Sequence, residues 1–256
     1  MFAEERKQKI LEFLTEHRKA TVNELVSFFE VSNTTIRNDL REMENEKLLI
    51  RTHGGAMLRT RSGFEPDPYE TPMKNVQEKK RIAQAALELI DDGDTIILDT
   101  GTTTMELAMV LASKKNIRVI TNDLLIALLL EDNENIIDLL FVGGIVRKGY
   151  HCTLKYRAAT AEMLSGLTVD KAFFTVNGFS YEKGATSPDI AQAEIKALLR
   201  SVAATVVILC DSSKLGSAYF VQFASLEQID KLITDRIEQV EKERLEEKGV
   251  DVIIAP

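Results

Sequence analysis

The spacing of apolar residues predicts three consecutive helices at the start of the chain. Each repeats apolar side chains three or four positions apart, which gives a helix one buried stripe. These helices are expected over residues 4–16, 22–29 and 33–45. Thr21 and Glu24 form a capping box before the second helix, and Ser32 is a suitable N-cap for the third. Only residues 30–32 separate the last two helices, as in a helix-turn-helix.

The third helix combines an apolar face with a polar one. Ile36, Leu40 and Met43 recur at the helical period and form the apolar face. The opposite face carries hydrogen-bonding and cationic groups, namely Thr34, Arg37, Asn38, Arg41 and Asn45. Such a face can be solvated, as in a small helical bundle, or can lie in a DNA groove. The helix alone leaves both possibilities open.

A short hairpin directly after this helix favours DNA binding over the bundle. Residues 48–52 and 56–58 are predicted to be its strands, with the turn at His53-Gly54-Gly55, where glycine permits positive φ. A helix-turn-helix followed by a small basic hairpin is the plan of a winged helix-turn-helix. The side chains expected at the DNA are Ser32, Thr34, Thr35, Arg37, Asn38, Arg41, Arg51, His53 and Arg59.

The pattern changes after residue 61. Residues 62–75 hold Pro66, Pro68 and Pro72 and few apolar residues, which is typical of a semi-rigid linker. From residue 76 onward, short β-branched runs alternate with helical stretches. This alternation predicts the α/β class, with a mainly parallel sheet covered by helices on both faces. We therefore expect a DNA-binding domain over 1–61, a linker over 62–75 and an α/β domain over 76–256.

The individual elements of the α/β domain can be placed from the same pattern. Strands are expected at residues 95–99, 118–121, 139–142, 172–176, 206–210, 231–234 and 250–254. Helices are expected at residues 77–89, 105–112, 124–131, 157–164, 190–202 and 237–247.

Composition and charge agree with a cytoplasmic DNA-binding protein of two domains. The 256 residues are 45% hydrophobic, with no run long enough to span a membrane and no signal-peptide pattern. Cys152 and Cys210 are far apart in the chain, which favours reduced thiols in a cytoplasm. The net charge is −8, but residues 1–61 carry +1, which leaves −9 for the rest. Because phosphates repel an acidic body, only the N-terminal domain should lie on DNA.

Polar residues follow several predicted strands, at the sheet edge where ligands bind in such folds. Residues 99–104 pass from a strand through a glycine to a helix start, and this geometry suits an anion, phosphate above all, although it also fits an ordinary threonine cap. Lys214 would add a cation there, or remain a solvated surface lysine. The expected effector site is Asp99, Thr100, Gly101, Thr102, Thr103, Thr104, Thr121, Asn122, Gly143, Gly144 and Lys214.

Residues with catalytic or metal-binding chemistry are poorly placed for it. His151 and Cys152 are adjacent, but neither has a partner at zinc-site spacing, so each is interpreted as a loop or packing residue. Asp99 and Asp211 end strands, where a lone carboxylate binds sugar hydroxyls as readily as it moves protons. We expect no catalytic residue, no metal ligand and no cofactor.

These residues resemble the DeoR-type family of bacterial sugar and nucleoside operon repressors. The N-terminal resemblance rests on Val31-Ser32, Thr35-Ile36-Arg37, Asp39-Leu40 and Arg51–Ala56. The C-terminal resemblance rests on Leu98–Thr104, Thr121-Asn122, Gly143-Gly144, Asp211–Lys214 and Ile233–Asp235. The resemblance implies a sensor domain similar to ribose-5-phosphate isomerase, a phosphorylated sugar as effector, release from operator DNA, and a homo-oligomer, either a dimer or a tetramer.

Three residues depart from the family pattern. Asn38 stands where a second arginine is usual, and asparagine pairs with adenine where arginine prefers guanine. Tyr156 replaces a glycine beside the expected pocket, and Gln192 stands where the family often has glutamate. The operator sequence and the particular sugar therefore cannot be carried over.

Two alternatives come from other classes of protein. The first is a sugar-phosphate isomerase with an added DNA-binding domain. Isomerase relatives place paired acids after the strand that matches Phe173–Gly178, whereas this chain has no carboxylate there before Glu182. The second is a purely architectural DNA-binding protein, which would have no use for an anion-binding loop.

Overall fold

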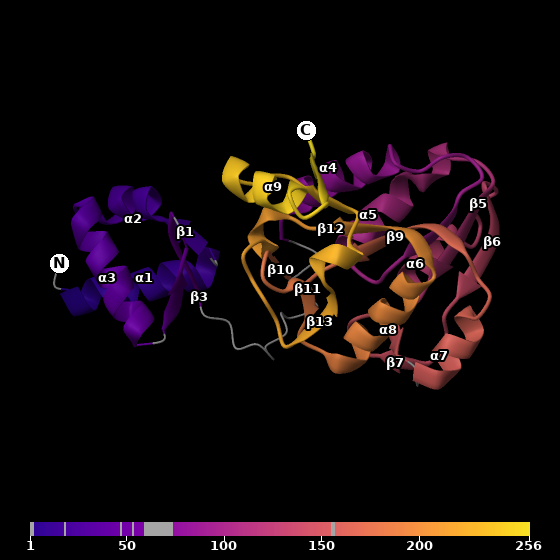
Figure 1. Cartoon of the computed structure of the whole chain (residues 1–256), viewed down its shortest axis with the longest axis horizontal. Coiled ribbons are helices and arrows are strands. Elements are labelled where there is room, and N and C mark those ends of the chain that lie inside the picture. Colours follow the sequence, from indigo (N-terminus) through magenta and orange to yellow (C-terminus); the bar gives the residue numbers. More distant parts are fainter. Residues whose placement is uncertain (1–2, 18, 47, 53, 59–73, 155–156) are drawn as a thin grey trace. The chain divides into compact units, whose positions relative to one another are not determined.

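The computed structural model describes residues 3–17, 19–46, 48–52, 54–58, 74–154 and 157–256 (Figure 1). The chain divides into two compact units, residues 1–61 and 62–256, which are taken separately below. His53, Arg59, Tyr156 and residues 62–73 of the predicted linker lie outside the described residues.

The smaller unit contains the predicted helices and hairpin. Its elements are α1 (Ala3–His17), β1 (Lys19–Thr21), α2 (Val22–Phe29), α3 (Asn33–Asn45), β2 (Leu49–Arg51) and β3 (Gly55–Leu58). The predicted capping box is confirmed, since the Thr21 hydroxyl accepts from the Glu24 N–H at 3.2 Å and the Glu24 carboxylate accepts from the Thr21 N–H at 2.7 Å. Ser32 caps α3 by accepting from the Thr35 N–H at 3.1 Å.

Strand β1 was not predicted from the sequence, and its position explains why residue 55 is a glycine. The three strands form an antiparallel sheet in the order β1-β3-β2, with Thr21 opposite Gly55. A Cβ on Gly55 would lie 2.0 Å from the carbonyl oxygen of Ala20, and neither Gly54 nor Gly55 has a positive φ. The expectation of positive φ was therefore wrong for these two glycines. Gly55 is required because β1 approaches β3 closely.

The core of this unit joins α1 to α3, and it includes one ion pair. Ile10 and Leu14 of α1 pack with Ile36, Leu40 and Met43 of α3, all at most 1% exposed. Beside them, the Arg6 guanidinium donates to both carboxylate oxygens of Asp39, at 2.5 Å and 3.0 Å. Both side chains are buried, so the pair fixes the position of α3 on α1 at the cost of desolvating two charges.

Replacing Arg6 by methionine is expected to destabilise this unit by about 3 kcal/mol, because it leaves the Asp39 carboxylate buried without its partner. The Arg6→Met/Asp39→Leu double variant should recover most of that loss, since it removes both desolvated charges. Chemical denaturation of the full chain measures both. A double variant that is no more stable than the single one would contradict this account of the pair.

The larger unit is built on a seven-stranded parallel sheet. In space the strands run β15-β14-β12-β9-β4-β5-β6. Their bounds are β4 (Thr95–Leu98), β5 (Ile117–Thr121), β6 (Ile136–Phe141), β9 (Val169–Thr175), β12 (Ala203–Leu209), β14 (Lys231–Thr234) and β15 (Asp251–Ile254). The helices are α4 (Val76–Leu87), α5 (Thr102–Val110), α6 (Leu124–Leu130), α7 (Arg157–Leu164), α8 (Ile190–Ser201) and α9 (Gln239–Glu246), with 3-10 turns η2 (Leu111–Ser113), η3 (Ser212–Lys214) and η4 (Leu226–Gln228).

Helices cover both faces of this sheet, as the sequence predicted. Buried residues of α4, α5 and α6 pack on one face, with Ile96, Leu98 and Phe173. Buried residues of α7, α8 and α9 pack on the other, with Ile97 and Phe174. Figure 1 shows α4 and α8 on opposite sides of the strands. No helix among the described residues is long and apolar enough to cross a membrane.

Two small sheets were not predicted from the sequence. Strands β10 (Gly178–Ser180), β11 (Gly184–Ser187) and β13 (Val221–Ala224) form an antiparallel sheet, and β7 (Ile145–Arg147) pairs with β8 (Cys152–Leu154). These strands have three or four residues each, too few for an alternating pattern to be recognised. They matter because they carry Cys152 and the residues around Thr186 to the carboxyl edge of the main sheet.

The order of the main sheet contains one topological switch point. From β4 the chain proceeds outward through β5 to β6, and from β9 it proceeds in the opposite direction through β12 to β14 and β15. Strands β4 and β9 are neighbours, so the direction of winding reverses between them. In open parallel sheets, ligands bind in the crevice outside the strand ends at such a point.

Candidate functional site: recognition helix and sensor edge

The predicted DNA-binding face of α3 is exposed. Thr34, Arg37, Asn38, Arg41 and Asn45 all lie at the surface, whereas Ile36, Asp39, Leu40 and Met43 on the other side of the helix are buried. The helix therefore presents two guanidinium groups and two amides to solvent from one side. This is the arrangement that a helix lying in a major groove requires.

Three other predicted DNA-contact residues are partly engaged within the unit. The Thr35 and Ser32 hydroxyls lie 2.8 Å apart in the α3 cap. The Arg51 guanidinium lies 3.7 Å from the Glu44 carboxylate, which also accepts from the Arg51 N–H at 3.1 Å. Arg51 thus connects β2 to α3, and its charge is partly neutralised within the unit.

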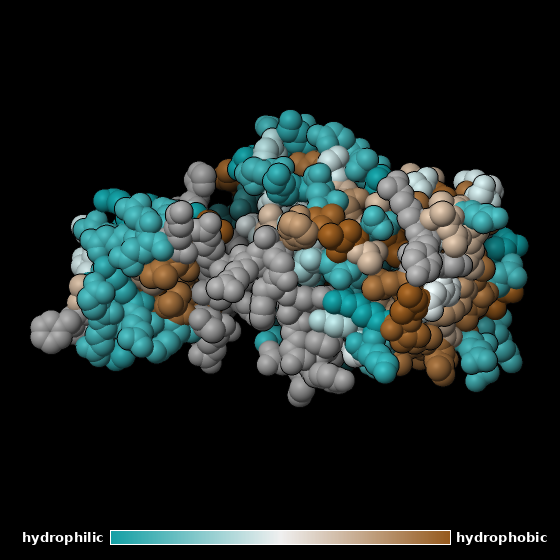
Figure 2. Space-filling view, turned by 90° about the horizontal axis from the view of Figure 1, so that it is seen from below, coloured by the Kyte–Doolittle hydropathy of each residue, from teal (hydrophilic) through white to brown (hydrophobic). Residues whose placement is uncertain are grey.

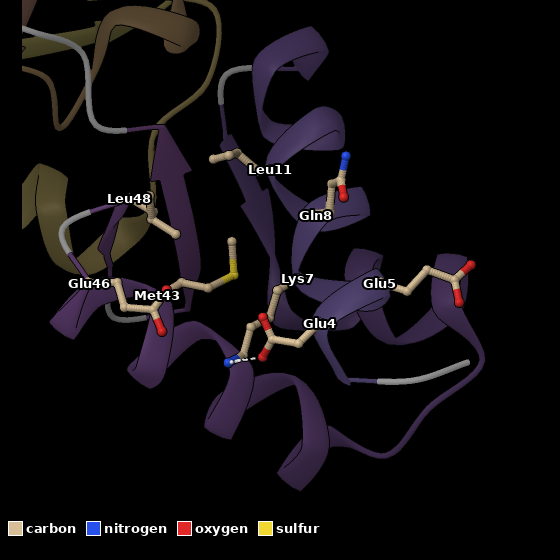
Figure 3. Close-up of a pocket in the computed structure, with 8 residues that line it drawn as sticks. All are labelled: Glu4, Glu5, Lys7, Gln8, Leu11, Met43, Glu46 and Leu48. Atoms are coloured by element: carbon tan, nitrogen blue, oxygen red, sulfur yellow. Dashed lines mark hydrogen bonds and ion pairs between the residues drawn. The ribbon is translucent and has the colours of Figure 1, made fainter.

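A surface pocket in this unit is lined by none of the predicted DNA-contact residues (Figure 3). It lies between α1 and the end of α3, and its lining residues are Glu4, Glu5, Lys7, Gln8, Leu11, Met43, Glu46 and Leu48. Three carboxylates against one ammonium make it unsuited to a phosphate. The ammonium of Lys7 is itself held by Glu4 at 3.0 Å and Glu42 at 2.7 Å.

In the larger unit, the 99–104 loop lies at the topological switch point. Asp99 follows β4, and its carboxylate accepts from the N–H of Thr175 at the end of β9, at 3.2 Å. Helix α5 begins at Thr102, and the Gly101 position provides no side-chain cap. A Cβ on Gly101 would lie 2.4 Å from Thr175 Oγ1, so glycine is required where the two strand ends approach. The first N–H groups of α5 therefore lie at the crevice without acceptors in their own helix.

The hydroxyls of this loop contribute less than the sequence suggested. Thr103 and Thr104 are buried, and the Thr104 hydroxyl donates back to the Gly101 carbonyl at 2.9 Å. Thr100 donates to the Asp123 carboxylate at 2.8 Å. Of the four threonines, only the Thr102 side chain is both half-exposed and without such a bond among the described contacts. Backbone N–H groups, more than hydroxyls, are therefore the donors for an anion.

Asp99 occupies a different environment from the one expected. Its side chain has no exposed surface, and Lys196 of α8 donates to its carboxylate from an equally buried ammonium. Lys196 also donates to the Thr175 carbonyl at 3.1 Å. Burial raises the pKa of the Asp99 carboxyl above its ordinary value, and the positive charge of Lys196 opposes that rise. Sequence reasoning did not find Lys196, because one lysine on an amphipathic helix carries no signal of its partner.

The ends of β5 and β6 are joined to this loop by buried polar residues. Thr121 and Asn122 are at most 2% exposed. Asp123 caps α6 by accepting from the N–H groups of Leu125 and Ile126, at 2.9 Å and 3.2 Å, and its other oxygen binds Thr100. Gly143 follows β6 with open space around its Cβ position, and Gly144 is exposed. The segments after β4, β5 and β6 are thus consecutive along one edge, as predicted.

Lys214 lies farther along the edge. Its loop follows β12, and β9 separates β12 from β4, so the two loops start about 10 Å apart. Lys214 is half-buried, and Lys79 in the first turn of α4 lies near both it and Asp211. Burial lowers the pKa of the Lys79 ammonium, and Asp211 opposes this. Lys79 is a second cation at this edge, and sequence reasoning did not select it.

The histidine and cysteine candidates form no metal site. Cys152 is buried, and burial raises the pKa of its thiol, so it stays protonated at neutral pH. The Gln192 amide donates to its sulfur at 3.9 Å. His151 is exposed at the turn before β8. Within the described part of the chain, no group of three His, Cys, Asp or Glu residues is placed to hold a metal ion.

Comparison with known proteins agrees with this arrangement of a DNA-binding face and a sensor edge, defined as the strand-end residues 99–104, 121–123, 143–144 and 211–214. Residues 6–62 match the DeoR-like helix-turn-helix domain, and residues 74–236 match the DeoR C terminal sensor domain. The HTH-type transcriptional regulator GlpR of Haloferax volcanii is 36% identical over 255 residues, which cover 99% of this chain and 98% of that protein. The HTH-type transcriptional repressor GlcR of Bacillus subtilis is 37% identical over 256 residues, covering 99% and 97%.

Among solved structures, a D-ribose-5-phosphate isomerase in complex with phospho-erythronic acid is 18% identical, with a TM-score of 0.41 over 55% of this chain and 54% of that one. Such a likeness is too weak to support an argument about function. The two domain matches and the full-length relatives are sufficient: the chain belongs to the DeoR family and is a DNA-binding transcriptional regulator with a C-terminal sensor domain.

Proposed function

We propose that this regulator represses a carbohydrate-utilisation operon and that a phosphorylated sugar, bound at the sensor edge, releases it from operator DNA. The observation that carries the proposal is the topological switch point between β4 and β9, where α5 begins without a side-chain cap. Relatives whose names give them as a transcriptional repressor and as an aga operon transcriptional repressor support the assignment to repression.

In this proposal the phosphate binds the N–H groups at residues 101–104. Lys214 and Lys79 add positive charge from the neighbouring loop and helix, which favours a doubly charged phosphate over a neutral sugar. The sugar then extends toward the ends of β4 and β5, where Asp99 and Asn122 lie. Cytoplasmic operation is part of the proposal, because operator DNA and phosphorylated sugars are found there.

One residue offers a route from the sensor edge to the linker. Asn75 is the N-cap residue of α4, yet its side chain does not cap the helix. Its amide donates instead to Asp211 at 2.8 Å and to Ser213 at 3.2 Å, in the loop that carries Lys214. A ligand that moves this loop therefore also moves the residue at which the linker enters the sensor domain. Since the ligand contacts only this domain, it acts by favouring one arrangement of the whole protein.

The experiment that tests the proposal is a thermal-shift screen of the full chain against phosphorylated sugars, the same sugars without phosphate, and inorganic phosphate. A ligand that binds only the folded state raises Tm, and raises it further at higher concentration. We expect a sugar phosphate to raise Tm more than either control. Equal shifts with the unphosphorylated sugar would overturn the assignment of the anion site.

The isomerase alternative is not favoured by any contact in the structure. The segment after β9 carries Val176, Asn177 and Phe179 but no carboxylate. An enediol mechanism needs a positioned base with access to its substrate. We therefore propose that the sensor domain binds its sugar phosphate without converting it.

The regulator is expected to act as a homo-oligomer. One recognition helix reads a single short half-site, which is too little for genomic specificity, so two or more copies must bind repeated half-sites. An apolar face is available for self-association: Leu125, Leu128 and Leu129 of α6 are 45%, 66% and 44% exposed. Figure 2 shows apolar side chains gathered toward the end of the larger unit that holds α6, α7 and β7 in Figure 1.

Leu128→Glu is expected to shift the chain from oligomer to monomer, because it places a charge in the centre of this apolar face. Val240→Glu is the matched control, since Val240 is also 66% exposed but lies on α9. Sedimentation velocity at micromolar concentration distinguishes the two. A wild-type chain that sediments as a monomer while it binds operator DNA at full affinity would contradict the prediction.

A further inference from the structure

The buried polar cluster behind the sensor edge contains two acceptor atoms that lack a hydrogen bond. Asp99 Oδ1 and Asn122 Oδ1 are both buried and both unpartnered among the described residues. A buried acceptor without a donor is destabilising, and native proteins supply one from the protein, from water or from a ligand. Two such atoms in one cluster indicate that donors are missing here.

The two acceptors lie at neighbouring strand ends. Leu98 of β4 is paired with Thr121 of β5, so Asp99 and Asn122 are the next residues on adjacent parallel strands, about 4.8 Å apart. Side chains at equivalent positions of adjacent parallel strands point to the same face. Asn122 is fixed by its amide, which donates to the Thr153 carbonyl at 3.3 Å, so its oxygen is the atom left available.

Lys196 determines which atom of Asp99 is left available. The carboxylate Oδ2 accepts from Lys196 and from the Thr175 N–H, whereas Oδ1 accepts from neither. The ammonium also binds the Thr175 carbonyl and lies 5.3 Å from the ring centre of Phe223, so it is held on every side by α8, β9 and β13. Its positive charge opposes the rise in the pKa of the Asp99 carboxyl, and its hydrogen bond fixes the orientation of that carboxylate.

Two uncharged polar side chains lie beside the two acceptors. Cys152 keeps its proton, and Gln192, which lies one helical turn before Lys196 on α8, places its amide 3.9 Å from the Cys152 sulfur. Both are buried. Lys196 offsets the charge of Asp99, and the buried Asp123 carboxylate, which accepts from Thr100 at 2.8 Å, means that the cluster has no excess positive charge; this suits hydroxyl groups and not a second phosphate.

We infer that Lys196 is a positioning residue for effector recognition: it orients Asp99 so that Asp99 Oδ1 and Asn122 Oδ1 together accept hydrogen bonds from two neighbouring hydroxyl groups of the bound sugar. The inference rests on the proposed function and deepens it. It requires an effector with hydroxyls on adjacent carbons, beyond its phosphate. A site that hydrogen-bonds a hydroxyl discriminates against the analogue that lacks it, because its own polar groups are then left unpaired.

The test compares pairs of probes that differ by one hydroxyl. Binding of ribose 5-phosphate against 2-deoxyribose 5-phosphate, of glucose 6-phosphate against 2-deoxyglucose 6-phosphate, and of inorganic phosphate alone is measured by calorimetry on the full chain. Wild type is expected to prefer the hydroxylated member of at least one pair by about 10-fold or more. Lys196→Met and Asn122→Leu should reduce that preference to about one while binding of inorganic phosphate is unchanged.

A folding control is built into the design. Lys196→Met leaves the buried Asp99 carboxylate without its partner, which can destabilise the fold. The Lys196→Met/Asp99→Asn double variant removes both charges. It therefore tests whether the loss of preference follows from loss of fold. A preference that survives in both single variants overturns the inference, as does a wild type that binds both members of each pair equally, the result expected if water satisfies the two acceptors. Failure of every phosphate probe to bind wild type instead overturns the proposed function and, with it, this inference.

Discussion

Alanine at Arg37 or at Asn38 should weaken binding to the cognate operator by about 1–3 kcal/mol and relax specificity at one base-pair position. Both side chains are exposed on the polar face of α3, whose opposite face is fixed on α1 by Ile36, Leu40 and the Arg6–Asp39 pair. Because this core holds the helix in one orientation, we propose that these two side chains contact the base edges. An electrophoretic or fluorescence titration against operators with single substitutions measures both effects.

Lys9→Ala serves as the matched control for charge. Lys9 is a half-exposed cation of the same unit, paired with Glu5 on α1 and away from the α3 face. Its removal should change affinity little and should leave the order of preference among operators unchanged. Unaltered preference in both Arg37→Ala and Asn38→Ala would show that another face of the unit contacts the bases.

Lys214→Ala should abolish most of the response of operator binding to a sugar phosphate. The variant loses a charge at the proposed phosphate site, so the ligand no longer favours one state of the protein; the normal coupling is expected to be about 1–3 kcal/mol, or roughly 5- to 150-fold in operator affinity. Lys115→Ala, which removes an exposed lysine after α5, is the control. A response of wild-type size in Lys214→Ala would place the phosphate elsewhere.

The Asn75→Ala variant separates binding of the sugar phosphate from its effect on operator affinity. Asn75→Ala removes the amide that bonds Asp211 and Ser213 but no part of the proposed phosphate site. It should bind the sugar phosphate with nearly normal affinity and yet transmit less of that binding to the operator. If both properties fall together, Asn75 belongs to the binding site itself.

Much of this fold follows from local pattern. Ser32, Thr21 and Glu24 mark helix starts that the structure confirms, and the alternation of short apolar strands with helices predicted a parallel sheet covered on both sides. These features depend on neighbours within a few residues. Strand β1 and the β10-β11-β13 sheet do not, because three or four residues acquire strand geometry only from a distant partner.

At the sensor edge, too, local features could be predicted from the sequence, whereas contacts between distant residues could not. The 99–104 loop could be found because a strand, a glycine and a helix start are consecutive in sequence. The burial of Asp99 could not, since it depends on Lys196, which lies 97 residues later and on another helix. Likewise, the contact between Cys152 and Gln192 unites two positions that stand 40 residues apart. Partners of this kind follow from topology and are invisible to spacing.

We propose that operator DNA and a sugar phosphate bind preferentially to opposite states of this protein. Thermodynamic linkage makes this claim measurable from either side, because the factor by which the ligand weakens operator binding must equal the factor by which the operator weakens ligand binding. The decisive measurement is the Kd of the active sugar phosphate for the full chain, with and without saturating operator DNA. The account predicts weaker binding with operator present, by the same roughly 5- to 150-fold factor seen in the operator titration. An identical Kd in both conditions, for a ligand that binds the sensor edge, would contradict it.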